Sequence, residues 1–323
     1  MPSPADPATA RTLDAFDAFD VLGADQWRAR ERAHAARVER FAAPFIERRH
    51  AGRKHPVEDF LFTYYTQKPG QLQRWHPGAG VVLLDAADTE RAGWKFYRTA
   101  PPEEAGRAGS GVVLDAAAFL EARREAVDFA RVILAGTAAR PAQLSCFGLH
   151  EWAMAYRSEE NGIRHEYLPL RLGAGGTDRV VEEHRIRCTH FDAFRFYAPQ
   201  AAPLNELQPT RATQRELEQP GCLHANMDLY KWAYKLTPAI HSELVMDCFE
   251  LAWEIRTMDM QASPYDLAEW GYEPLRIETP AGKARYVELQ RGFAERAQEL
   301  RGRLLDAVEH LAGAARPVAG SRS

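Results

Sequence analysis

The last third of the chain carries three long segments with the residue pattern of helices, at 223–236, 239–260 and 280–312. Two further amphipathic patterns, at 25–49 and 115–136, have apolar residues at helical spacing. Short apolar runs at 80–84 and 92–99 are typical of strands. The sequence therefore predicts a mainly α fold, a single helical domain with a small β element at about residues 80–98.

Local signals set the expected boundaries of these elements. Asp25 is a candidate N-cap for the first helix, and Pro44 is expected to kink or end its last turn. Asp178 is a candidate cap for a short helix after a glycine-rich turn, and the Pro- and Gln-rich residues 198–221 are expected to form a long loop. A single catalytic domain is expected over 25–313, between a flexible N-terminal lead at 1–24 and a flexible tail at 314–323.

Composition places the chain in an ordinary class of globular proteins. Of its 323 residues, 46% are hydrophobic and 27% charged, and the net charge is −4. No apolar run approaches the ~18 residues of a membrane span, and the N-terminus lacks the order of a signal peptide. Four cysteines without a C-x-x-C pair favour a reducing compartment. We therefore expect a cytoplasmic protein with no membrane partner.

A thiol, an imidazole and a carboxylate occur together three times, in "SCFGLHEWAMAY", "RCTHFDAFRF" and "GCLHANMDLYKW". The imidazoles are those of His150, His190 and His224. Three histidines from separate segments can hold a catalytic Zn, Fe or Mn ion with one open position. One hypothesis is therefore a metal-dependent enzyme acting on a small molecule.

A second hypothesis uses the same segments without a metal. A half-buried carboxylate with a raised pKa, from Glu151, Asp192 or Asp228, would serve as general base. The neighbouring aromatic residues would stack on a planar substrate, and nearby cations would bind an anionic tail. The aromatic candidates are Trp152, Phe191 and Tyr230, and the cationic ones are Lys231 and Arg195.

A third interpretation is that these groups only mark core segments, because free cysteines are usually buried and a buried histidine often bonds to a backbone carbonyl. The chain would then be a non-catalytic helical binding protein.

A basic strip runs from Arg28 to Lys54, a segment that contains nine Arg or Lys residues and three Glu residues. Such a strip favours binding of phosphates, but a solvated helix face with Arg–Glu pairs has the same composition.

Four segments carry a resemblance to a known group: "KHPVEDFLFTYY", "CFGLHEWAM", "CTHFDAFRF" and "QPGCLHANMDLYKWAYKL". From Trp27 to about Leu305 the chain resembles actinobacterial proteins named 3-methyladenine DNA glycosylase. The resemblance implies a DNA-repair hydrolase that cleaves the N-glycosidic bond of an alkylated purine, needs no cofactor, and binds damaged DNA through the basic strip. The nearest match to a helix–hairpin–helix turn is "HPGAGV", with no Asp at the usual distance, so no catalytic Asp is assigned by motif.

Overall fold

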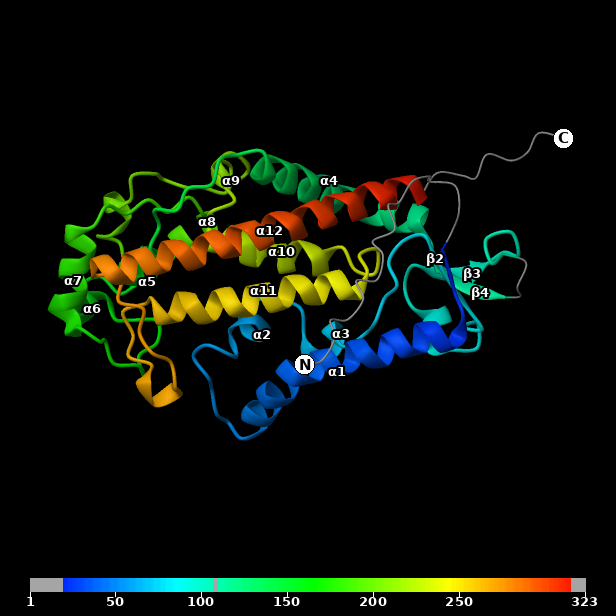
Figure 1. The fold of residues 1–323 in the computed structure, drawn as a ribbon, viewed down its shortest axis with the longest axis horizontal. Coiled ribbons are helices and arrows are strands. Elements are labelled where there is room, and N and C mark those ends of the chain that lie inside the picture. The colour runs from blue at the N-terminus through cyan, green and yellow to red at the C-terminus, as the bar shows by residue number, and fades with distance from the viewer. Residues whose placement is uncertain (1–19, 107–109, 315–323) are drawn as a thin grey trace, which may run out of the picture.

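A computed structural model describes residues 20–106 and 110–314, which form a mainly helical structure with a small sheet at one end (Figure 1). The expected fold class is confirmed. The helices are α1 (Ala24–His50), α2 (Phe60–Tyr64), α3 (Pro69–Leu72), α4 (Ala116–Ala138), α5 (Leu149–Met154), α6 (Ser158–Asn161), α7 (Gly173–Glu183), α8 (Phe191–Phe194), α9 (Gln214–Leu217), α10 (Leu223–Lys235), α11 (Ser242–Gln261) and α12 (Pro280–Ala314), with single 3₁₀ turns at Glu90–Gly93, Ala202–Leu204 and Ala268–Trp270.

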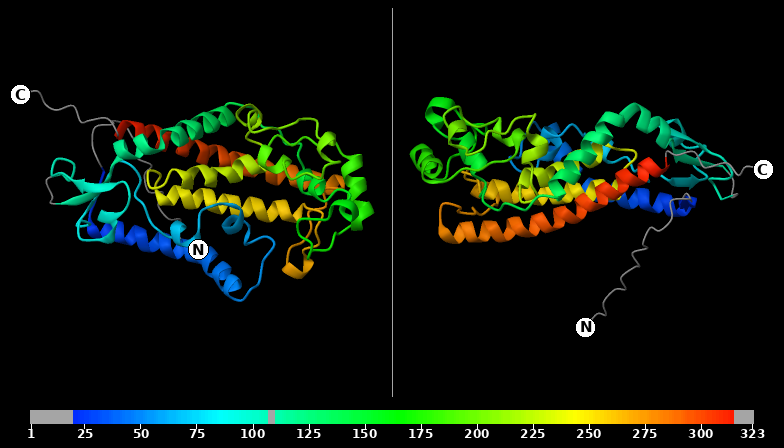
Figure 2. Two further views of the ribbon diagram at one scale, coloured as in Figure 1. Left: turned by 180° about the vertical axis from the view of Figure 1, so that it is seen from behind. Right: turned by 90° about the horizontal axis from the view of Figure 1, so that it is seen from above.

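The long helices α4, α10, α11 and α12 form the bundle, and α12 runs along one side of it (Figures 1 and 2). Helices α10 and α11 form a hairpin whose facing residues are almost all buried. Phe249 lies at its centre, in edge contact with Tyr230 and with Phe41 of α1. Aromatic burial of this kind dominates core energetics, so the hairpin is the rigid element that carries the site.

The sheet lies at the opposite end of the bundle from the short helices α5 to α8 (Figure 1). Its strands β1 (Asp20–Leu22), β2 (Val81–Leu84), β3 (Tyr97–Ala100) and β4 (Gly111–Leu114) follow the order β1-β2-β4-β3. Strand β1 pairs parallel with β2, and the other pairs are antiparallel. The β element is therefore wider than the predicted 80–98, because β1 and β4 join it from outside that range.

Several boundary expectations were wrong. The first helix begins at Ala24 with Gly23 as N-cap, so Asp25 lies in the first turn and is not the cap. Pro44 does not end the helix, which continues to His50, and the expected kink stays a prediction. Asp178 lies inside α7, where its carboxylate accepts a bond from the Arg157 backbone N–H at 2.7 Å. Residues 198–221 are mostly loop but include the short helix α9.

The two segments expected to be flexible lie mainly outside the described residues, which leave out 1–19 and 315–323. The described end of the N-terminal segment forms β1 and the start of α1. None of the helices within the described residues has both the length and the apolar character needed to cross a membrane.

Candidate functional site

The structure brings the three predicted histidines together at the end of the bundle away from the sheet. His150 lies in the first turn of α5, His190 is the N-cap of α8, and His224 is the second residue of α10. The ring centroid of His224 lies 4.4 Å from that of His150, in edge contact, and 5.3 Å from that of His190, nearly stacked. Three segments that are far apart in the sequence thus contribute one imidazole each to a single cluster.

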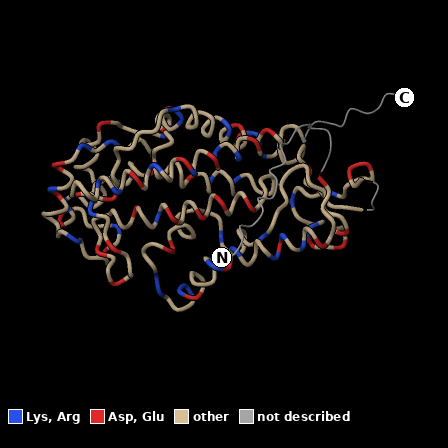
Figure 3. The backbone as a smooth tube through the Cα atoms, in the orientation of Figure 1, with Lys and Arg blue, Asp and Glu red and all other residues tan. Residues whose placement is uncertain are grey.

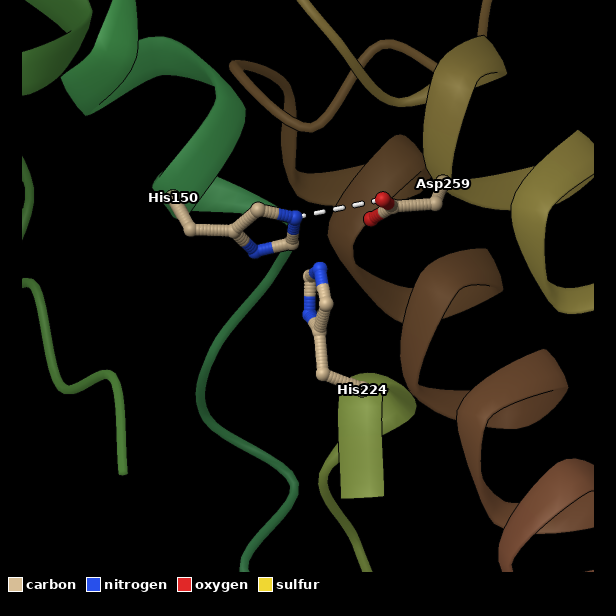
Figure 4. A group of neighbouring side chains, drawn as sticks. All are labelled: His150, His224 and Asp259. Atoms are coloured by element: carbon tan, nitrogen blue, oxygen red, sulfur yellow. Dashed lines mark hydrogen bonds and ion pairs between the residues drawn. The ribbon is translucent and has the colours of Figure 1, made fainter. Parts of the chain in front are cut away.

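Asp259 of α11 completes a group with His150 and His224 (Figure 4). The His150 Nε2 atom lies 3.2 Å from Asp259 Oδ2, and one ligand atom from each of the three residues lies within 4.8 Å of the others. On its other side, His150 Nδ1 lies 3.7 Å from the thiol sulfur of Cys146. The second Asp259 oxygen, Oδ1, is buried without a hydrogen-bond partner. Two imidazoles and a carboxylate therefore face one point.

The electrostatics of the two rings differ. Burial alone would lower the pKa of His150, but the adjacent Asp259 carboxylate outweighs burial and raises that pKa well above its usual value. Burial and the neighbouring His150 hold the pKa of His224 well below its usual value. At neutral pH His224 is therefore an uncharged imidazole, the form that binds metal ions, whereas His150 is protonated beside Asp259 and would release that proton on binding a metal.

A buried ion network supports this group from behind. Arg256, three residues before Asp259 on α11, donates to Glu151 Oε1 at 2.7 Å and lies 3.5 Å from Asp259 Oδ2. Burial would raise the pKa of Glu151, but the Arg256 guanidinium lowers it to about 2. Glu151 was predicted as a general base with a raised pKa. The raised pKa is wrong, since the carboxylate is paired with a buried guanidinium that lowers the pKa, and the general-base role stays a prediction.

The other two predicted carboxylates lie on the far side of His190. Asp228 Oδ2 lies 3.4 Å from His190 Nε2 and 2.5 Å from Lys231 Nζ, and Lys231 also reaches Asp192 at 3.2 Å. Asp192 bonds to Arg195 as well, at 3.2 Å. Burial would raise the pKa of Asp228, but the Lys231 ammonium lowers it below its usual value. The expected raised pKa is therefore absent at Asp228, and Lys231 and Arg195, predicted to bind a substrate anion, are paired with protein carboxylates.

The predicted aromatic pocket is not assembled. Trp152 and Tyr230 have no exposed surface. The Trp152 indole donates to the Ala262 carbonyl at 2.8 Å, and Tyr230 packs against other rings in the α10–α11 core. Phe191 is half-buried beneath Arg211, whose guanidinium lies 5.6 Å from the ring centroid. These residues stabilise the fold, because no face of Trp152 or Tyr230 is open to a planar substrate.

A small pocket opens beside the histidines. Its interior is about 10 Å³, roughly the space of one water molecule. Its lining brings the three repeated thiols together with two of the imidazoles: Gln143, Ser145, Cys146, His150, Arg187, Cys188, Thr189, Gln219, Cys222, Leu223 and His224. Burial raises the pKa of Cys188 to about 11 and that of Cys222 well above its usual value, so these two thiols stay protonated.

The basic strip lies on α1 and the loop after it, apart from this cluster. Arg30, Arg37 and Arg48 form ion pairs with acidic residues of α11 or of the loop before α2, and the remaining basic residues of the strip are exposed. Figure 3 shows basic and acidic residues interspersed along the helices of the described chain. These three pairs join the strip to other elements and are not the Arg–Glu pairs along one helix face that the alternative interpretation expected, so phosphate binding by the strip stays a prediction.

Sequence reasoning missed three residues of the site: Asp259, Arg256 and Glu218. Asp259 and Arg256 lie within the apolar pattern of α11, where two charges three residues apart on a buried face are the available signal. Glu218 follows α9 in a segment expected to be loop, and only its position near Cys222 points to it.

Comparison with known proteins adds no relative: no protein-family model matches the chain, and neither the curated proteins nor the solved structures include a match.

Proposed function

We propose that the protein is a metal-dependent enzyme acting on a small molecule, with a Zn, Fe or Mn ion held by His150, His224 and Asp259. The observation that carries the proposal is the convergence of two imidazoles and one carboxylate from three separate elements, with ligand atoms within 4.8 Å of one another. Two histidines and one carboxylate are the ligands of several zinc hydrolases and of non-haem iron enzymes, and they leave coordination positions open.

The surroundings of the group support this proposal. Ligating histidines usually bond through their second nitrogen to a neighbour that fixes the ring, and Cys146 lies in that place at His150 Nδ1. Arg256 lies beside Asp259 and orients its carboxylate in the same way. The unpartnered Asp259 Oδ1 offers a further acceptor in a region without exposed surface.

The small pocket suggests what occupies the open position. It borders His150 and His224 and has room for about one water-sized molecule. A metal ion lowers the pKa of bound water so that it becomes a nucleophile near neutral pH. Water activation therefore suits this site, with the reacting group of the substrate approaching from the pocket side.

The direct test is metal content, measured by elemental analysis after purification without added metal and after reloading with Zn²⁺, Fe²⁺ or Mn²⁺. His224→Ala and Asp259→Asn should each hold one equivalent less than the wild type. His50→Ala is the matched control, because this exposed histidine ends α1. An unchanged metal content in both site variants would overturn the proposal. If replacing the site histidines lowers only folding stability, the chain is instead a helical binding protein.

Glycosylase activity stays a prediction that rests on the resemblance to proteins named 3-methyladenine DNA glycosylase. The assay is release of 3-methyladenine from alkylated DNA, compared with a Glu151→Gln/Asp192→Asn/Asp228→Asn variant. Binding through about five phosphates should show a log–log salt slope of roughly −4.5. No release above the variant would remove this reaction.

A further inference from the structure

A second group of possible ligands lies beside the first and is not used by the function proposed above. His190, Glu218 and Asp228 come from the N-cap of α8, the C-cap of α9 and the middle of α10. Their side chains are buried, at 1%, 2% and 1% exposure, and one ligand atom from each lies within 4.8 Å of the other two. Three ionisable groups thus share a space that solvent does not reach.

The distances in this group do not match direct hydrogen bonds. His190 Nε2 lies 3.4 Å from Asp228 Oδ2 and 3.5 Å from Glu218 Oε1. A charged imidazole bonded to a carboxylate lies about 2.7 to 2.9 Å from it. Neither ring nitrogen of His190 has a hydrogen-bond partner. A buried imidazole that makes no hydrogen bond, and whose Nε2 has only the two longer ion-pair contacts, requires an explanation, because such groups are normally satisfied.

The two distances from His190 Nε2 match those between ligands of one metal ion. Atoms held at about 2.0 to 2.1 Å from an ion in tetrahedral geometry lie about 3.3 Å apart. From this spacing, from the His190 ring that makes no hydrogen bond and from the two buried carboxylates, we propose that His190, Glu218 and Asp228 form a second divalent-metal site. This site does not depend on metal binding by the first group.

Neighbouring groups hold both carboxylates in place. The Tyr65 hydroxyl donates to Asp228 Oδ1 at 3.0 Å, and the Gln214 amide donates to Glu218 Oε1 at 2.6 Å. Outer partners of this kind orient the carboxylates of metal sites. Lys231 neutralises part of the charge, but it is shared between Asp228 and Asp192. A carboxylate oxygen has lone pairs for both an ammonium and an ion, so Asp228 can serve both.

The position of His224 places the two sites next to each other. Its ring is in edge contact with His150 of the first group and nearly stacked on His190 of the second. A protein with both ions bound would therefore have two metals near each other at one end of the bundle.

The test is the Zn²⁺ stoichiometry of the full chain, measured by equilibrium dialysis after treatment with chelator. The wild type should bind two equivalents. Glu218→Gln should bind one, and Glu216→Gln is its matched control because Glu216 is exposed two residues away. His190→Ala should repeat the result of Glu218→Gln, and circular dichroism should show that both variants fold. Loss of a ligand should weaken Zn²⁺ binding at this site by more than the ~10- to 100-fold caused by loss of an outer partner.

The outcomes separate this inference from the proposed function. One equivalent fewer in Glu218→Gln than in the wild type supports the second site, whether the wild type binds two equivalents or one. If Asp259→Asn then also loses one equivalent, both sites stand, and if it loses none, the second site stands alone. One equivalent that is lost in Asp259→Asn and kept in Glu218→Gln overturns the second site and leaves the first. No bound Zn²⁺, or two equivalents kept in Glu218→Gln, also overturns the inference.

Discussion

Replacement of Glu151 by Gln tests whether this buried carboxylate stabilises the fold or takes part in chemistry. Its side chain is 6% exposed and accepts a bond from Arg256 Nη1 at 2.7 Å. Burial would raise its pKa, but Arg256 lowers it from an ordinary 4.5 to about 2. Since each pKa unit corresponds to 1.36 kcal/mol, the native structure favours the ionised form by about 3 kcal/mol. Glu151→Gln should therefore lower the free energy of unfolding by about 3 kcal/mol at pH 7.

The pH dependence follows from the sign of the shift. The native pKa lies below that of the unfolded chain, so the stabilisation is complete above about pH 4.5 and is lost as the pH falls towards 2. The difference between wild type and Glu151→Gln should shrink over the same range. Urea unfolding monitored by tryptophan fluorescence at pH 7 and pH 3.5 measures it, with chelator present so that metal binding at Asp259 makes no contribution.

The control for this experiment is Glu159→Gln, because Glu159 is exposed on α6. A double variant, Glu151→Gln with Arg256→Met, should recover part of the loss caused by Arg256→Met alone, which leaves buried carboxylates unpaired and costs about 3 to 5 kcal/mol. Unchanged stability of Glu151→Gln at pH 7 would refute this reasoning. If Glu151→Gln instead loses enzymatic activity while its free energy of unfolding is unchanged, Glu151 takes part in the reaction.

Three further changes have defined outcomes. Lys231→Met should cost about 3 kcal/mol in chelator, because it removes the ammonium partner of the buried Asp228 carboxylate, which keeps the Tyr65 hydroxyl and the His190 contact; added Zn²⁺ should reduce that loss in thermal unfolding. Glu243→Gln should cost about 1 kcal/mol in urea unfolding, since it weakens the hydrogen bond from Arg30. Burial raises the pKa of Glu243, but the hydrogen bonds that the carboxylate accepts lower this pKa overall. The cost of the substitution should therefore disappear as the pH falls well below about 4.3. Trp152→Phe should cost about 2 to 4 kcal/mol, because a buried carbonyl loses its donor and volume is lost, while metal content stays unchanged.

The long helices could be predicted because their patterns are local. The segment 223–236 was placed within one residue of α10, and 280–312 within two of α12. The missed strand β1 has no such signal. β1 has only three residues, from Asp20 to Leu22, and it exists as a strand through its pairing with β2, about sixty residues away. A pattern within one segment cannot show such a partner.

The candidate site could likewise be predicted only in part from the sequence. The repeated grouping of thiol, imidazole and acid identified His150, His190 and His224, and the structure brings all three together. The grouping also suggested that the nearest acids would complete the site. Instead, His150 faces Asp259, more than one hundred residues further along the chain, because α11 packs beside α5 at this end of the bundle. The predicted set of three histidines is divided between two groups: His150 and His224 lie with Asp259, and His190 lies with Glu218 and Asp228.

Anomalous X-ray scattering from crystals grown with Zn²⁺ tests the central claim most directly. The proposed function requires an anomalous peak between His150, His224 and Asp259, within about 2.0 to 2.2 Å of a ligand atom of each. A saturating Zn²⁺ concentration that gives no peak there, with the His150 Nε2 to Asp259 Oδ2 contact still closed at 3.2 Å, would contradict it.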